Sequence, residues 1–237
     1  MNTNNEFLSI QKLSVNPVYN ISPFTLLDYP DKTACIIWFA GCNMKCPYCY
    51  NPEIVSGKGK ISYFETLKFI ISRKGLLDGV VFSGGECTMH KNMDLFAAAV
   101  KKLGMLVKID TNGSNPAVIR RLIENQHVDY VALDFKATAS KYAKATGFAL
   151  FKQFAETFDI LNRSSIPFEV RTTVHSDLLS TADLQEMINY LTERQYRGTY
   201  YLQNIIHNTS TLGKMQRSAR IDLSDLKNET IDIVIRN

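Results

Sequence analysis

The sequence lacks three features that each define a class of proteins. No run of about 18 apolar residues occurs in its 237 residues, so no segment is long enough to span a bilayer as a helix. Residues 1–20 are polar and rich in asparagine, without the basic and then apolar order of a secretory signal. An excess of charge of one sign is also missing, because 27 Lys and Arg residues and 23 Asp and Glu residues leave a net charge of only +4. We therefore expect a cytoplasmic protein that binds neither a membrane nor nucleic acid.

Cysteine is also scarce, and its placement is uneven. There are five cysteines, and an odd number in a chain without a secretory signal argues against a disulfide framework. Cys42, Cys46 and Cys49 have the spacing C-x3-C-x2-C, which is typical of thiolates that bind a soft metal or an iron–sulfur cluster. Structural zinc prefers four ligands, so a zinc site would need a fourth from another loop, such as Cys87. We favour a four-iron cluster with three protein ligands and one open iron.

Short apolar runs alternate with longer amphipathic patterns along most of the chain. The apolar runs predict six strands, at Ala34–Phe39, Gly79–Phe82, Leu106–Ile109, Val128–Asp134, Phe168–Val174 and Thr199–Gln203. The amphipathic patterns predict helices at Tyr63 to about Lys74, Asn92–Leu103, Pro116–Asn125, Ala149–Arg163 and Ser180 to about Arg194. Ser62 and Glu65 have the spacing of a capping box, and Ser180 with Asp183 opens the last helix.

Strands that alternate with helices of this length build βαβ units and a parallel sheet. We predict one α/β domain over residues 1–237, an open, partial (β/α)6 barrel of the TIM type, with a doubly wound sheet as the alternative. In either fold the chemistry gathers at the carboxyl ends of the strands. Unusual polar segments do follow four successive predicted strands, at Gly41–Cys49, Ser83–Glu86, Asp110–Gly113 and Asp134–Lys136.

These four segments resemble, in order, the motifs of the radical S-adenosylmethionine (SAM) superfamily. The loop Gly41–Glu53 carries the three cysteines, with Tyr48 before the last of them, and Ser83–Glu86 resembles the GGE motif. The resemblance covers about residues 23–203 and leaves 204–237 as a tail. Within the superfamily, Pro23–Lys32 and the Asp-x-Lys at Asp134 and Lys136 are similar to glycyl-radical-enzyme activases. The short chain, with no cysteines for a second cluster, resembles the activating protein of anaerobic ribonucleoside-triphosphate reductase. Two departures from the activase pattern are Cys87, where Pro is expected, and Tyr50, where His is common.

The resemblance implies two cofactors and the residues that hold them. Cys42, Cys46 and Cys49 would bind three irons of a [4Fe–4S] cluster, and the amino and carboxylate groups of SAM would chelate the fourth. Reduction of the cluster would then break the S–C5′ bond and yield a 5′-deoxyadenosyl radical. The residues that the motifs place around SAM are Tyr48, Gly84, Gly85, Glu86, Asp110, Thr111, Asn112, Asp134, Lys136 and Arg171.

Each of these residues also has an ordinary structural interpretation. Glu86 would accept a hydrogen bond from the SAM ammonium, or it is an acidic residue at a helix N-terminus. Lys136 and Arg171 would meet the SAM carboxylate, or they form surface salt bridges. Three residues would supply oxygen ligands to a monovalent cation, or they cap loops. They are Asp110, Thr111 and Asp134.

Three functions are open on the sequence alone. The leading hypothesis is an activase that takes a hydrogen from a backbone glycine of a glycyl radical enzyme, first of all anaerobic ribonucleotide reductase, with flavodoxin or ferredoxin as the electron donor. The second is a radical SAM enzyme that acts on a small molecule, as 7-carboxy-7-deazaguanine synthases do. The third is a zinc- or cluster-binding module without turnover. The sequence does not assign roles to Cys87, His175 and His207.

Overall fold

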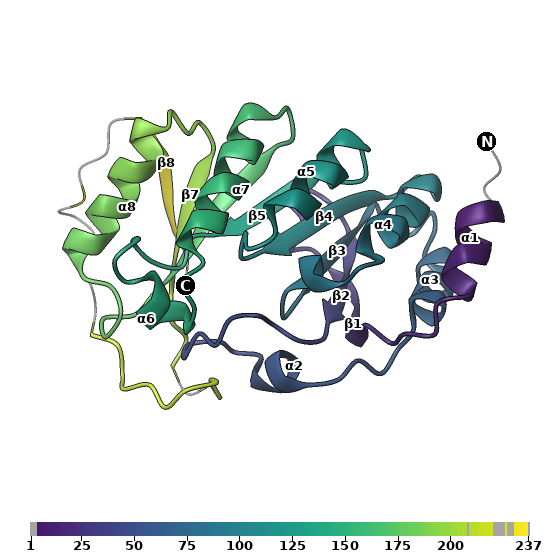
Figure 1. The fold of residues 1–237 in the computed structure, drawn as a ribbon, viewed down its shortest axis with the longest axis horizontal. Helices are drawn as coiled ribbons and strands as arrows, with labels where there is room; N and C mark the ends of the chain where they lie inside the picture. The colour runs from purple at the N-terminus through teal and green to yellow at the C-terminus, as the bar shows by residue number, and fades with distance from the viewer. Residues whose placement is uncertain (1–3, 208, 220–225, 227–229, 237) are drawn as a thin grey trace. The chain divides into compact units, whose positions relative to one another are not determined.

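The computed structural model describes residues 4–207, 209–219, 226 and 230–236. Eight strands form one sheet whose spatial order follows the chain (Figure 1). The strands are β1 Val18–Thr25, β2 Ala34–Phe39, β3 Gly79–Gly84, β4 Leu106–Thr111, β5 Tyr130–Asp134, β6 Phe168–Val174, β7 Thr199–Asn204 and β8 Asp232–Arg236. Among the described residues no ladder joins β1 to β8, so the sheet is open. The prediction of an open α/β fold with a parallel sheet is confirmed, except that β1 runs antiparallel to β2, so the sheet is mostly parallel. Strands β2 to β7 are the six predicted strands, and β1 and β8 are additional.

Along the chain, helices α2 to α8 lie between consecutive strands from β2 to β7, as βαβ units require. The helices are α1 Asn4–Gln11, α2 Pro52–Ser56, α3 Tyr63–Ser72, α4 Met93–Lys102, α5 Pro116–Glu124, α6 Tyr142–Thr146, α7 Phe151–Arg163 and α8 Thr181–Glu193, with a 3-10 turn, η1, at Cys87–Met89. The five predicted helices are α3, α4, α5, α7 and α8. Ser62 with Glu65 and Ser180 with Asp183 form reciprocal capping boxes at the starts of α3 and α8. No described helix is long and apolar enough to cross a membrane.

The chain divides into two compact units. Unit 1 comprises Met1–Asn43, Glu53–Thr111 and Asn115–Val131, and unit 2 comprises Met44–Pro52, Asn112–Ser114 and Ala132–Asn237. The cysteine loop therefore contributes to both units: Cys42 belongs to unit 1, and Cys46 and Cys49 belong to unit 2.

Unit 1 is built on three parallel strands with an antiparallel strand at the edge. β2 pairs with β3 and β3 with β4 in parallel, while β1 runs antiparallel to β2. The side chains of β2 are almost all buried, because both of its faces are covered. One face carries a cluster of aromatic rings from Phe39, Tyr63, Phe82 and Phe96, and α1 packs against α3 and α4 (Figure 1). This packing fixes the carboxyl ends of β2, β3 and β4, where three of the motifs begin.

β1 was not evident in the sequence, and its composition explains why. The strand contains Asn20, Ser22 and Pro23, and most of its side chains are at least partly exposed. Pro23 falls within a break in the β1–β2 register, between Ser22 and Thr25. Proline has no backbone N–H to donate, and an edge strand tolerates it where the ladder requires no donor at that position.

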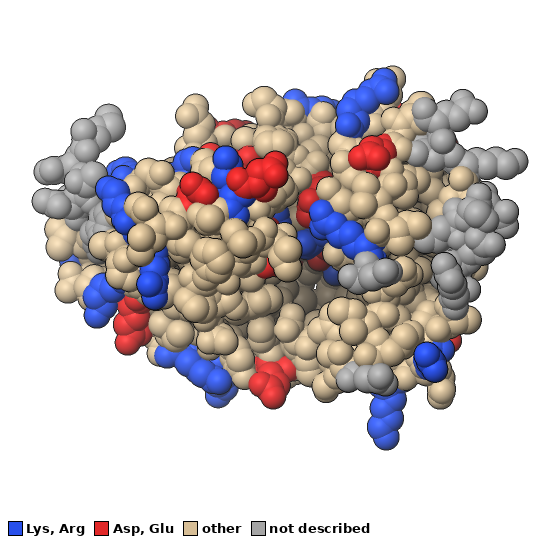
Figure 2. All heavy atoms as spheres, turned by 180° about the vertical axis from the view of Figure 1, so that it is seen from behind, with Lys and Arg blue, Asp and Glu red and all other residues tan. Residues whose placement is uncertain are grey.

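Unit 2 contains β6, β7 and β8, which are parallel to one another. The late apolar run Ile231–Ile235 of the sequence forms β8. Aromatic rings from α7, α8 and the end of β5 pack together, with Phe135 stacked on Phe154 at 4.6 Å between ring centroids. On the face shown in Figure 2, basic and acidic side chains are interspersed among uncharged ones rather than gathered into a continuous patch of one sign.

Candidate functional site

The second and third cysteines of the motif lie at the two ends of a tight turn in unit 2. The Cys49 N–H donates to the Cys46 carbonyl at 3.0 Å, so Pro47 and Tyr48 form the turn between them. The Lys45 N–H donates to the Thr146 carbonyl at 2.7 Å, which ties the start of the turn to the end of α6. Cys46 is buried and Cys49 partly exposed, and both are free thiols. No disulfide therefore competes for these sulfur atoms as ligands.

The donor set suits an iron–sulfur cluster. In the described part of the chain, no three His, Cys, Asp or Glu side chains form a group that could hold one metal ion. The three cysteines of a [4Fe–4S] cluster each bind a different iron, so they need not surround one point. Cys87, the candidate for a fourth zinc ligand, is buried and donates through its thiol to the Asp110 carbonyl at 3.5 Å.

Lys136 places a positive charge beside the cysteine turn. Its Nζ lies 5.9 Å from the centroid of the Tyr48 ring. Burial raises the pKa of the Cys46 thiol, and the Lys136 ammonium and the Tyr48 hydroxyl oppose part of that rise. A thiolate at Cys46 would therefore have a nearby positive charge and a hydroxyl donor to stabilise it.

Asp134, Lys136 and Arg171 form a partly buried ion-pair triad at the ends of β5 and β6. Asp134 Oδ2 lies 3.0 Å from Lys136 Nζ, and Asp134 Oδ1 lies 3.0 Å from Arg171 Nε. Burial alone would raise the pKa of Asp134, but Arg171 and Lys136 hold it below its usual value. Burial alone would lower the pKa of Lys136, but Asp134 raises it above its usual value. All three groups are therefore charged at neutral pH.

Arg171 and Lys136, the two cations predicted to meet the SAM carboxylate, have different further contacts in the structure. Arg171 is shared between two acids, because its Nη1 also lies 3.9 Å from Glu169 Oε1. Lys136 Nζ also lies 5.9 Å from the centroid of the Tyr48 ring, and its charge acts to lower the pKa of Cys46. Lys136 therefore faces the cysteine turn, while Arg171 holds Asp134 in place.

In unit 1, the glycines of the GGE motif bring its backbone against the start of the cysteine loop. The Gly85 N–H donates to the Phe39 carbonyl and the Glu86 N–H donates to the Gly41 carbonyl, both at 2.9 Å. A Cβ on Gly85 would lie 1.8 Å from the Gly41 oxygen, and Gly84 has a φ of +116°. No other residue fits at Gly85, because the atom in the way belongs to the backbone. Gly85 thus lies directly against Gly41, the residue before Cys42, while Gly84 lies against the backbone of Phe39.

Glu86 is buried, and three hydrogen bonds converge on its Oε1. The donors are the Thr88 N–H at 3.1 Å, the Thr88 hydroxyl at 2.5 Å and the Thr111 hydroxyl at 2.8 Å. Glu86 is also the N-cap of η1, as the structural interpretation expected. These bonds hold the carboxylate in one orientation, so capping and ligand recognition are compatible for this side chain.

The other oxygen groups of the predicted site are also engaged within their own units. Asp110 forms an ion pair with buried Lys108 at 2.5 Å and accepts a hydrogen bond from the Ser83 hydroxyl at 3.1 Å. Asn112 Oδ1 accepts from the Ser114 N–H at 2.9 Å. A buried lysine in the apolar strand β4 is the sequence signal that predicts such a pair, since lysine is almost never buried without a partner.

Cys87 and His175, whose roles the sequence left open, are structural residues. Burial raises the pKa of Cys87 well above its usual value, and Glu86 and Asp110 add to the rise. A thiol in this setting is unreactive. His175 is fully buried, with its Nδ1 accepting from the Asp177 N–H at 3.1 Å and its Nε2 lying 3.0 Å from the Gln216 carbonyl. His207 is exposed.

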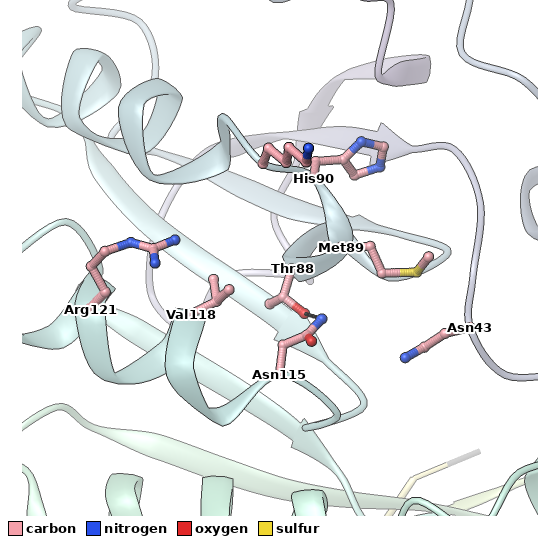
Figure 3. Close-up of a pocket in the computed structure, with 8 residues that line it drawn as sticks. Asn43, Thr88, Met89, His90, Asn115, Val118 and Arg121 are labelled. Carbon is pink, nitrogen blue, oxygen red and sulfur yellow. Dashed lines mark hydrogen bonds between the residues drawn. The ribbon is translucent and has the colours of Figure 1, made fainter.

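A pocket of about 590 Å³ lies beside this site in unit 1 (Figure 3). It is bounded by η1, the start of α5 and Asn43, the residue after Cys42. The Asn115 amide donates to the Thr88 hydroxyl at 3.0 Å, and Thr88 in turn binds Glu86. His90 donates from Nε2 to the Ala40 carbonyl, and burial lowers its pKa, so it is neutral at pH 7. Thr88 thus lines the pocket and also binds Glu86, a residue of the predicted SAM site.

Comparisons with known proteins give the same assignment as the motifs. The model of the Radical SAM superfamily matches residues 36–191. A Methanocaldococcus jannaschii protein, named as a glycyl-radical enzyme activating enzyme, is 33% identical over 180 residues, which are 72% of this chain and 73% of that protein. The pyruvate formate-lyase-activating enzyme of Clostridium pasteurianum is 30% identical over 50% of this chain and 52% of its own.

A solved structure supports the fold. SuiB of Streptococcus suis bound to S-adenosylmethionine has a TM-score of 0.65 at 14% identity, over 85% of this chain and 52% of that chain. This chain thus spans about half the length of that protein. The chain belongs to the radical SAM superfamily. Its relatives place it in the branch of glycyl-radical-enzyme activating enzymes, so a [4Fe–4S] cluster and SAM are its family's cofactors.

Proposed function

We propose that this protein activates a glycyl radical enzyme by removing a hydrogen atom from the Cα of one glycine in its partner. The observation that carries the proposal is the 33% identity to the M. jannaschii activating enzyme, which extends over nearly three quarters of both chains. The partner that we propose first is anaerobic ribonucleoside-triphosphate reductase, because the sequence carries no cysteines for a second cluster and is similar in this to the activating protein of that reductase.

The proposed cluster ligands are Cys42, Cys46 and Cys49. The free thiols, the tight Cys46–Cys49 turn and the charge of Lys136 beside Cys46 support this assignment. When bound, the reduced cluster supplies the electron that cleaves SAM into methionine and the 5′-deoxyadenosyl radical. The chain supplies position and excludes water around that chemistry.

The remaining motif residues would hold SAM, with roles that follow from their settings. Glu86 would accept a hydrogen bond from the SAM ammonium, in the orientation that Thr88 and Thr111 fix. Lys136 would meet the SAM carboxylate, since Arg171 is engaged by both Asp134 and Glu169. Further groups that we propose to line the SAM site are Tyr48, Gly84, Gly85, Asp110, Asn112 and Asp134.

A monovalent cation is a further proposal, with Asp110, Thr111 and Asp134 as its oxygen ligands. Each of these groups already has a partner in the chain, namely Lys108, Glu86 and the triad cations. A bound cation would have to exchange some of these contacts. We therefore expect a modest dependence of SAM cleavage on K⁺, measured against a medium in which a bulky organic cation replaces it.

The electron donor that we propose is flavodoxin or ferredoxin, and the proposed compartment is the cytoplasm. The five free cysteines support a reducing compartment.

The test is to mix the reconstituted, reduced protein and SAM under anaerobic conditions with either anaerobic ribonucleotide reductase or pyruvate formate-lyase. We expect a glycyl-radical doublet by EPR, together with 5′-deoxyadenosine, in the reductase sample. A doublet only with pyruvate formate-lyase would show that the partner is of that kind and that the reductase assignment is wrong. SAM cleavage with no doublet in either sample would contradict the activase assignment.

The second candidate is a radical SAM enzyme for a small molecule. It is supported by the 7-carboxy-7-deazaguanine synthase of Aquifex aeolicus, which is 27% identical over 49% of this chain. That likeness is weaker and shorter than the likeness to the M. jannaschii protein. Formation of 7-carboxy-7-deazaguanine, the product that the name of this relative gives, would favour this candidate over the activase.

A further inference from the structure

The tail of the chain runs along the second half of the cysteine loop. We name residues 205–207 and 209–219 the strap. The Leu212 N–H donates to the Cys49 carbonyl at 3.0 Å, and the Gly213 N–H donates to the Pro47 carbonyl at 2.8 Å. Two consecutive backbone bonds thus join the strap to the turn that carries Cys46 and Cys49.

A third contact ties the start of the strap to the residue after Cys49. The Ile206 N–H donates to the Tyr50 hydroxyl at 2.6 Å. Tyr50 is the position at which the activase pattern commonly has His, and in this chain its hydroxyl serves as an acceptor for the strap. Phenylalanine would keep the ring but could not accept this bond.

The far end of the strap is fastened to the end of β6. The Nδ1 of His175 accepts the Asp177 N–H, so its proton is on Nε2, which donates to the Gln216 carbonyl at 3.0 Å. The Ser176 N–H donates to the Ser218 hydroxyl at 3.0 Å, and the Ala219 N–H donates to the Ser176 hydroxyl at 2.9 Å. The strap is therefore held at both ends, with the cysteine turn under its middle.

The contact at Gly213 is too close for a side chain. A Cβ there would lie 2.7 Å from Pro47 Cβ and 3.1 Å from Pro47 Cα. Pro47 has a rigid ring and cannot swing aside, so the strap or the turn must move if Gly213 is replaced. Glycine is thus needed for the strap to lie directly on the turn.

We propose that the strap positions Cys46 and Cys49 for ligation by bracing the turn between them, with Tyr50 and Gly213 as positioning residues. The backbone bonds reduce the freedom of the Pro47–Cys49 segment before any cluster is bound. Preorganised ligands bind with less loss of conformational entropy, so a braced turn favours cluster assembly and slows its loss. The inference rests on the proposed cluster role of the cysteines, and not on the identity of the substrate.

The test is alkylation of each cysteine by iodoacetamide in the metal-free, full-length protein, followed by peptide mass spectrometry. We expect Tyr50→Phe to speed the alkylation of Cys46 and Cys49 about fivefold, the population change that one lost hydrogen bond produces. Gly213→Ala should have a larger effect. Cys42 serves as an internal reference, and buried Cys35 and Cys87 report global unfolding.

Two comparisons show whether faster alkylation comes from release of the strap or from local damage at the substituted residue. Ser218→Ala removes an anchor bond at the far end of the strap, and we expect it to speed alkylation of Cys49 as well. The effects of Tyr50→Phe and Gly213→Ala should be less than additive, because both release the same segment. Ser72→Ala, which removes an exposed hydroxyl bond to the Phe69 carbonyl at the end of α3, is the control for Ser218→Ala and should change nothing.

A spectroscopic readout links the strap to the cluster. In the reconstituted proteins we expect Tyr50→Phe and Ser218→Ala to bind iron but to lose the cluster absorbance in air several-fold faster than the wild type. Unchanged thiol reactivity in Ser218→Ala and Gly213→Ala would contradict the proposal that the strap positions Cys46 and Cys49. Such a result would leave the activase assignment intact, since SAM cleavage is measured separately.

Discussion

Replacing Asp134 by Asn should destabilise the protein, because it leaves Lys136 and Arg171 as two like charges without their shared acid. Their side chains are only 17% and 16% exposed, and that of Asp134 is 23% exposed. Removing one partner of a fully buried pair costs about 3–5 kcal/mol, so partial exposure reduces the expected loss to about 2–3 kcal/mol. With a urea m value of about 2.5 kcal/mol/M, the unfolding midpoint should fall by about 1 M.

The assay is urea unfolding of the metal-free chain followed by circular dichroism. Asp159→Asn is the matched control, because Asp159 and Arg194 form an exposed pair at 3.7 Å with 42% and 36% exposure. Such a pair contributes at most about 1 kcal/mol. Equal midpoint shifts for the two variants would refute the reasoning about burial.

The same variant has a defined dependence on pH. The folded-state pKa of Asp134 is lowered, so its stabilising effect is complete above the ordinary aspartate pKa of about 3.9 and is lost as the pH falls through the lowered value. The difference in midpoint between wild type and Asp134→Asn should therefore be constant between about pH 5 and 8 and shrink below about pH 4. A difference that grows on acidification has the wrong sign for this mechanism.

Three further variants test the proposed site. Cys46→Ala should lose the cluster and all SAM cleavage, as measured by iron and sulfide content and by 5′-deoxyadenosine formation; full activity would remove Cys46 from the ligands. Glu86→Gln keeps an amide oxygen for Thr88 and Thr111, so iron content should persist while SAM affinity falls at least about tenfold by loss of a charged acceptor. Gly85→Ala should cost more than about 3 kcal/mol in a urea titration, because its Cβ meets the Gly41 carbonyl, whereas Gly75→Ala, with open space around it, should cost about 1 kcal/mol for its positive φ. Equal losses for the two glycine variants would contradict the close-approach argument.

The parts of the fold that the sequence predicted are those with strong periodic signals. The buried runs of β2 to β7 and the amphipathic faces of the five long helices were recognisable because each element buries one regular set of side chains. β1 was not, because it is an edge strand with polar residues and a proline. Helices α2 and α6 have five residues each, too few for a periodicity to show.

The sequence motifs propose individual site residues, but they do not predict the contacts between those residues. Asp134, Lys136 and Arg171 were each singled out, but the sequence does not show that β5 and β6 bring them into one triad. The strap was missed for a different reason: it is held mainly by backbone N–H and carbonyl groups, which every residue has and no sequence pattern marks. Tyr50 was visible only as a departure from a family pattern.

Hydrogen transfer from a glycine of the partner enzyme can be followed by isotope labelling. Anaerobic ribonucleotide reductase, the partner that we propose first, would be prepared with glycine deuterated at Cα and mixed with the reduced protein and SAM without oxygen. We expect one deuterium in the 5′-deoxyadenosine, in step with growth of a glycyl-radical signal. Formation of 5′-deoxyadenosine that contains no deuterium would show that the hydrogen comes from another source, and the protein would then not act on the glycine of this partner.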